Sequence, residues 1–136
     1  TGDVVTITLR SDTFDTYLLL YDAFGMELIR DDDSAGDLDS RISAYTIPTG
    51  GTYTIVVDSF GHATGDEIPA MGDYALTLAA AVIHPIEYTQ AVAGVIEEEN
   101  PVALYRFSGS AGDLVTIVLD TDSRSLNMRL EDEYGY

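Results

Sequence analysis

The sequence contains no cysteine, no lysine and no tryptophan, and only two histidines among its 136 residues. Without cysteine, the protein cannot form disulfides, use a thiol nucleophile or ligate zinc through sulfur. All six cations are arginines, set against 24 aspartates and glutamates, so the formal net charge is −18. Binding to a phosphate backbone requires a basic surface. We therefore expect no nucleic-acid partner.

Long apolar runs are missing as well. The longest, residues 76–86, is interrupted by Thr77, His84 and Pro85 and is too short to cross a bilayer. We therefore expect no membrane insertion. Neither His62 nor His84 stands in a serine–histidine–carboxylate pattern, and no serine lies in a G-x-S-x-G motif. The sequence predicts a protein that is not an enzyme.

The sequence is rich in the alternation that is typical of β-strands. Val5, Ile7 and Leu9 share one face of an extended chain, while threonines occupy the other. Glycine and proline separate such runs and mark turns. We predict strands near residues 3–9, 16–22, 40–47, 52–58, 73–79, 86–96, 102–108, 113–119 and 126–132. Short strands separated by turns, with no long helix, predict an all-β antiparallel sandwich.

The two ends of the chain carry two copies of one pattern. Residues 1–26 and 111–136, shifted by 110 without a gap, are identical at ten of 26 positions. The identical pairs are Gly2/Gly112, Asp3/Asp113, Val5/Val115, Thr6/Thr116, Ile7/Ile117, Leu9/Leu119, Asp12/Asp122, Leu20/Leu130, Asp22/Asp132 and Gly25/Gly135. They fall on a strand, a turn and a second strand. We infer one period of 110 residues followed by the start of another.

The series of motifs resembles the bacterial pre-peptidase C-terminal domain. The matching runs are TGDVVTITL and its copy AGDLVTIVL, then FDTYLLLYDAFG, DDDSAGDLDSRI, YTIPTGGTYTIVV and GDYALTL. In that family, a leader strand and a YRF-like strand precede the first of these runs. Here the leader is residues 88–96 and the YRF strand is residues 103–107, and both follow GDYALTL. The resemblance covers nearly the whole chain.

This resemblance implies a β-sandwich of jelly-roll type that is cut out of register with its repeat. Residues 1–81 resemble a pre-peptidase C-terminal-like sandwich that lacks its leader strands. Residues 82–136 resemble the leader strands and the first half of the next sandwich repeat. Because members of the family occur beside secreted proteases and as repeats in large surface proteins, the resemblance also implies an extracellular or cell-surface location. Members act as substrate-binding, secretion-associated or adhesive modules, and some bind calcium.

One loop is a candidate cation site. Asp31, Asp33, Asp37 and Asp39 lie close together in the sequence, and calcium prefers about six to eight oxygen ligands. We take these four residues as a candidate calcium site and expect no other cofactor. The alternative is a solvated loop in which aspartates accept hydrogen bonds from backbone N–H groups.

Two functions remain open at this stage. The first is a non-enzymatic extracellular structural module, a repeat or subunit of a surface filament whose partners are copies of itself. A sandwich without its first strands has an open sheet edge and an uncovered apolar face. Residues 1–26 and 111–136 cannot both occupy one position in one sandwich, so residues 84–136 would join another copy, head to tail, by strand complementation or as tandem repeats. The alternative is a substrate- or glycan-binding accessory domain of a secreted hydrolase.

Overall fold

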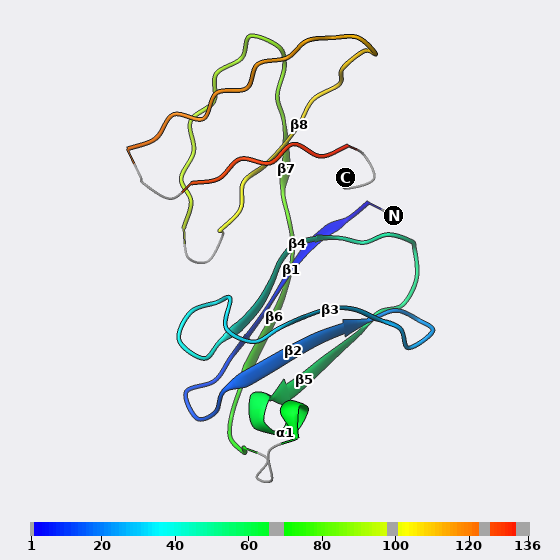
Figure 1. Cartoon of the computed structure of the whole chain (residues 1–136), viewed down its shortest axis with the longest axis vertical. Helices are drawn as coiled ribbons and strands as arrows, with labels where there is room; N and C mark the ends of the chain where they lie inside the picture. The colour runs from blue at the N-terminus through cyan, green and yellow to red at the C-terminus, as the bar shows by residue number, and fades with distance from the viewer. Residues whose placement is uncertain (1, 66–69, 98–100, 123–125, 133–136) are drawn as a thin grey trace.

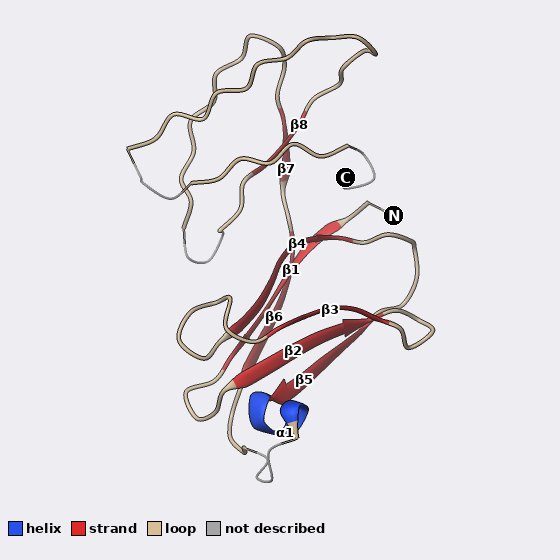
Figure 2. Ribbon diagram, viewed as in Figure 1, coloured by secondary structure: helices blue, strands red, loops and turns tan. Residues whose placement is uncertain are grey.

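The computed structural model describes residues 2–65, 70–97, 101–122 and 126–132. The elements in chain order are β1 (Val4–Arg10), β2 (Thr16–Tyr21), β3 (Glu27–Asp31), β4 (Ser40–Thr46), β5 (Thr54–Ser59), α1 (Phe60–Thr64), β6 (Ala75–Ala80), β7 (Ile83–Pro85) and β8 (Leu104–Arg106). In the described ranges, Figure 2 shows strands and loops, with α1 as a single short helix. The predicted all-β class is confirmed.

Two antiparallel sheets form a sandwich in the first part of the chain (Figure 1). One sheet has the order β4-β1-β6 and the other has the order β3-β2-β5. Between them lies a core of five buried aliphatic side chains, Ile7, Leu9, Leu18, Leu20 and Ile42. Each comes from one face of an alternating strand, which is why period-2 patterning located most of these strands.

The β1 pairings show how the alternation divides the sheet into two faces. Ile7 lies opposite Ile42 of β4 and Leu78 of β6, so apolar residues line the inner face. Thr6 lies opposite Ala79 on the outer face. In an antiparallel pair, directly opposed residues share a face. The outer face of β1 and β6 is therefore built mainly from small side chains.

A tight turn joins β2 to β3. Asp22 Oδ1 accepts hydrogen bonds from the backbone N–H groups of Phe24 at 2.9 Å and Met26 at 2.8 Å. Gly25 has a φ of 77°, which glycine adopts without a Cβ clash. The turn reverses the chain and produces β3, a strand that the sequence analysis did not predict.

The last third of the chain differs from the prediction. In its described residues, the predicted strands at 86–96, 113–119 and 126–132 are not formed. The predicted strand at 102–108 shortens to β8, which pairs in parallel with β7. A strand needs a neighbour for its backbone hydrogen bonds, and these alternating segments have no complete sheet to join. Their side chains are largely exposed.

Candidate functional site

One side of the sandwich is closed and the other is open. On the closed side, the edge strands β3 and β4 pack against each other across the two layers. On the open side, β5 and β6 each have one neighbour in their sheet. Leu76 and Leu78 of β6 lie opposite Leu9 and Ile7 and so belong to the inner face, yet they are 41% and 61% exposed. An apolar inner face is therefore uncovered between β5 and β6.

The edge of β6 has little to prevent another strand from pairing with it. An edge strand presents a row of free backbone donors and acceptors, and natural proteins usually protect such edges with charges, prolines or bulges. The sequence of β6 is ALTLAA, without charge or proline, and its pairing with β1 runs without a break in register. Such an edge is suited to accept a further strand.

The second copy of the repeat is uncovered too. Leu9 is fully buried, at 0% exposed, whereas the equivalent Leu119 is 47% exposed. Leu20 is 2% exposed, whereas the equivalent Leu130 is 60% exposed. Residues of the same type are thus core in one copy and surface in the other. The described part of 111–132 carries the apolar pattern of a sandwich layer without the layer that would cover it.

The acidic loop between β3 and β4 is organised by two of its carboxylates. Asp31 accepts hydrogen bonds from the backbone N–H groups of Ser34 at 3.1 Å and Arg41 at 2.7 Å, and from the Ser34 hydroxyl. Asp39 Oδ1 accepts a hydrogen bond from the backbone N–H of Ser11 at 3.0 Å. Both residues thus have the capping role that the alternative reading predicted. They tie the loop to β4 and to the β1–β2 connection.

The other two candidate ligands, Asp33 and Asp37, lie exposed on the same loop. Asp37 has a φ of 53°, in the left-handed region that aspartate tolerates. Among the residues that the structure describes, no three carboxylate or imidazole side chains are grouped so that they could hold a metal ion. The calcium site therefore stays a prediction.

Asp15, at the start of β2, has an unusual environment beside this loop. Its Oδ1 is buried and has no hydrogen-bond partner. Desolvation by burial raises the pKa of Asp15, and the nearby carboxylates of Asp33 and Asp32 raise it further. The raised pKa of Asp15 could not be predicted from the sequence, because Asp15 meets Asp32 and Asp33 only in the folded chain.

A histidine, a serine and an aspartate meet at α1, but as a helix cap. The Ser59 hydroxyl accepts a hydrogen bond from the backbone N–H of His62 at 3.4 Å, as expected of an N-cap residue. The His62 ring pairs with Asp58 at 2.8 Å. The serine thus contacts the histidine backbone, which is a structural arrangement and differs from a nucleophile–base pair.

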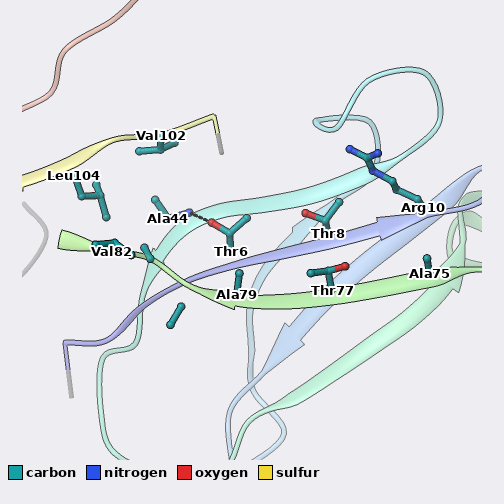
Figure 3. Close-up of a pocket in the computed structure, with 12 residues that line it drawn as sticks. Thr6, Thr8, Arg10, Ala44, Ala75, Thr77, Ala79, Val82, Val102 and Leu104 are labelled. Atoms are coloured by element: carbon teal, nitrogen blue, oxygen red, sulfur yellow. Dashed lines mark hydrogen bonds between the residues drawn. The ribbon is translucent and has the colours of Figure 1, made fainter. Parts of the chain in front are cut away.

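A hollow lies on the outer face of the β4-β1-β6 sheet (Figure 3). Its volume is about 420 Å³, and alanines and threonines of β1 and β6 make up half of its lining. Arg10 stands at one end, and Val82, Val102 and Leu104 stand at the other. The Thr6 hydroxyl there accepts a hydrogen bond from the backbone N–H of Ala44 at 3.2 Å. The lining offers no carboxylate, thiol or imidazole for acid–base chemistry.

Within the described ranges, the structure has no helix that is long and apolar enough to span a membrane. Comparison with protein-family models, with curated proteins and with solved structures found no match.

Proposed function

We propose that this protein is a non-enzymatic structural module of the cell surface or extracellular space, a repeat or subunit of a filament. Each sandwich in the filament is completed by strands from another copy. The order of motifs, with its resemblance to pre-peptidase C-terminal domains, supports the location and the module type. The open side of the sandwich and the uncovered second copy support the mode of assembly.

The observation that carries the proposal is the contrast between equivalent residues. Leu9, Leu18 and Leu20 are buried, whereas Leu119, Met128 and Leu130 at the matching positions are exposed. Burying one such side chain is worth about 1.5–3 kcal/mol. Contact with the second half of another sandwich, the region equivalent to 27–81, would recover that free energy. This contact would also give residues 114–119 a neighbouring strand for their backbone hydrogen bonds.

The geometry of such a contact favours an open-ended product. The donating segment, 84–136, and the receiving segment, 1–81, are different surfaces of the repeat. A heterologous contact of this kind builds a chain of subunits unless its rotation happens to close a ring. Tandem repeats within one longer polypeptide use the same contacts. The net charge of −18 keeps neighbouring filaments apart by repulsion.

Sedimentation velocity over a range of protein concentrations, followed by negative-stain electron microscopy, tests this proposal. We expect a concentration-dependent series of oligomers that lengthen into filaments. Leu119→Asp places a charge on the inner face of the second copy and should abolish the series. Val118→Asp is the matched control, because its equivalent in the first copy, Thr8, points to the outer face, so this variant should still assemble.

A compact monomer at every concentration, with Leu119→Asp as destabilising as Leu9→Asp, would contradict the proposal. That result would mean that the second copy is already buried within its own chain. It would favour the alternative of an accessory domain that binds a substrate or glycan of a secreted hydrolase. Retention of the monomer on a polysaccharide column would then support the alternative directly.

A further inference from the structure

We propose that Arg41 is the binding residue of a carboxylate site on the outer face of the β4-β1-β6 sheet. The carboxylate is supplied either by an acidic side chain of a second copy or by a small organic acid, since both present the same group. The site does not depend on assembly, so the dilute chain is sufficient to test it.

The burial of Arg41 is unusual for an arginine. Only 7% of its surface is exposed. By contrast, the side chains of Arg10 and Arg30 are 36% and 60% exposed. An arginine is almost never fully buried unless it is paired, because taking its charge out of water is costly. The guanidinium of Arg41 therefore needs a partner that replaces the lost water.

The described residues give this guanidinium one partner. Arg41 Nε donates a hydrogen bond to the Thr8 hydroxyl at 3.4 Å, and no described carboxylate forms an ion pair with Arg41. Two carboxylates of the adjoining loop are engaged elsewhere. Asp31 accepts the backbone N–H of Arg41 at 2.7 Å, and Asp39 pairs with Arg10 at 3.9 Å. The two Nη atoms of Arg41 are left without an acceptor.

These Nη atoms are open to an incoming group. In the part of the chain that the structure describes, Asp15 Oδ1 is the single side-chain nitrogen or oxygen that is both sealed from solvent and without a hydrogen-bond partner. The Nη atoms of Arg41 have no partner either, so they cannot be sealed and must reach the surface.

Space for the body of a ligand lies next to the guanidinium. Arg41 is opposite Thr8 in the pairing of β4 with β1, and opposed residues share a face of the sheet. Thr8 lines the hollow on the outer face, whose volume is about 420 Å³ (Figure 3). The lining of the hollow contains no acidic side chain, so no like charge faces a carboxylate there.

The chemistry of the site favours a carboxylate over other anions. The planar fork of a guanidinium matches the two oxygens of a carboxylate, and it matches phosphate as well. Phosphate carries more negative charge at neutral pH. Repulsion by the net charge of −18 grows in proportion to the charge of the ligand, so a singly charged carboxylate is repelled less.

Titration of the dilute full-length chain with sodium acetate tests the site, with sodium chloride at the same ionic strength as the reference for screening. NMR follows the Nε–Hε signals of the arginines, and we expect the Arg41 signal to shift with saturation. The signal of Arg106, which is exposed, should shift no more than it does in chloride. Acetate should also raise the melting temperature above that in chloride, because it binds the folded chain.

Substitutions assign the effect to Arg41. Arg41→Gln should remove the acetate-specific rise in melting temperature. Arg41→Lys should weaken acetate binding about tenfold, because an ammonium group lacks the fork. Arg106→Gln makes the same change of charge at an exposed position and should keep the rise. Melting temperatures in chloride show whether each variant folds, and Arg41→Met, which stays apolar along the buried stem, takes the place of Arg41→Gln if that variant does not fold.

Three results would overturn the site. If the Arg41 signal shows no saturable shift, or if Arg41→Gln keeps the acetate-specific rise, the guanidinium is simply hydrated at the surface. If phosphate binds more tightly than acetate, the assignment to a carboxylate is wrong.

Sedimentation equilibrium separates the two sources of the carboxylate. If a second copy supplies it, Arg41→Gln should weaken self-association about tenfold, and acetate should compete with self-association. Arg30→Gln changes the net charge equally and should have a much smaller effect. Equal association of the two variants, or no association at all, together with saturable acetate binding by the native chain, assigns the site to a small organic acid.

Discussion

Ile7 and Ile117 occupy equivalent positions of the internal repeat, and their side chains are 1% and 43% exposed. Ile7 lies in the core of the sandwich between Ile42 and Leu78 in its sheet. Ile117 belongs to a segment without a sheet of its own in the described residues. The same sequence motif is therefore buried in the first copy and exposed in the second. What the second copy lacks is a sheet that covers its apolar side chains.

Truncating these two isoleucines should have opposite consequences. Ile7→Ala removes a buried side chain and should lower the free energy of unfolding of the dilute protein by about 2–5 kcal/mol. Ile117→Ala should leave that free energy within about 0.5 kcal/mol, as is usual for exposed positions, and weaken assembly instead. Urea unfolding at low concentration gives the first quantity, and sedimentation equilibrium gives the second. Equal destabilisation by both substitutions would contradict the assignment of Ile117 to an intermolecular core.

The β2–β3 turn offers a prediction about folding alone. Asp22→Ala removes an acceptor of two backbone hydrogen bonds, so it should lower the free energy of unfolding by about 1–2 kcal/mol. Asp3→Ala makes the same chemical change at an exposed position and serves as the control, with an expected effect near zero. Both are measured by urea unfolding. If Asp22→Ala has no larger effect than the control, its carboxylate does not hold the turn.

Asp15 should make stability depend on pH. Burial raises its pKa in the folded chain above the ordinary 3.8, and the negative charges of Asp33 and Asp32 raise it further. The folded state then binds this proton more tightly than the unfolded state does. The contribution of the protonated Asp15 carboxyl to stability is fully present below pH 3.8. It is lost as the pH rises through the pKa of the folded state.

Asp15→Asn should therefore flatten the dependence of stability on pH above 3.8 and raise the free energy of unfolding at pH 7. Since the residue is partly exposed, the gain should be less than about 1 kcal/mol. Urea unfolding across this pH range measures both effects. A variant that is less stable at pH 7, with an unchanged slope, would show that the ionised carboxylate has a stabilising partner.

Calcium binding at the acidic loop remains testable with the right choice of variant. If calcium binds the folded chain, millimolar calcium should raise the melting temperature by mass action. Asp33→Ala should abolish that rise with little effect on the calcium-free protein, because Asp33 is exposed. Asp31→Ala is unsuitable, because Asp31 holds the backbone of Arg41 and Ser34. No rise at millimolar calcium in the native chain would leave only the solvated loop.

The sequence predicted those strands whose apolar residues alternate cleanly. Val5, Ile7 and Leu9 of β1 are typical, because one face of the strand is core and the other is not. β3 was missed because Leu28 and Ile29 are adjacent and charged residues flank them. The preceding D-A-F-G turn was the signal that could have revealed it. α1 was missed because five residues are too few to show a helical period.

The candidate sites were less predictable, since they depend on contacts between distant parts of the chain. Asp39 hydrogen-bonds to the backbone of Ser11, and Asp15 lies near Asp33. Neither of these two contacts can be inferred from the spacing of aspartates within one loop. The strands predicted at 86–96, 113–119 and 126–132 have the right pattern, but a pattern specifies a face and does not supply the sheet that covers it.

Amide hydrogen exchange of residues 113–119 as a function of protein concentration tests the central claim most directly. The account predicts rapid exchange for Val115, Ile117 and Leu119 in dilute solution, while Val5, Ile7 and Leu9 exchange slowly. In the assembled protein, both sets should exchange slowly, because both then lie in complete sheets. Equal, slow exchange of the two sets in a dilute monomer would contradict the claim.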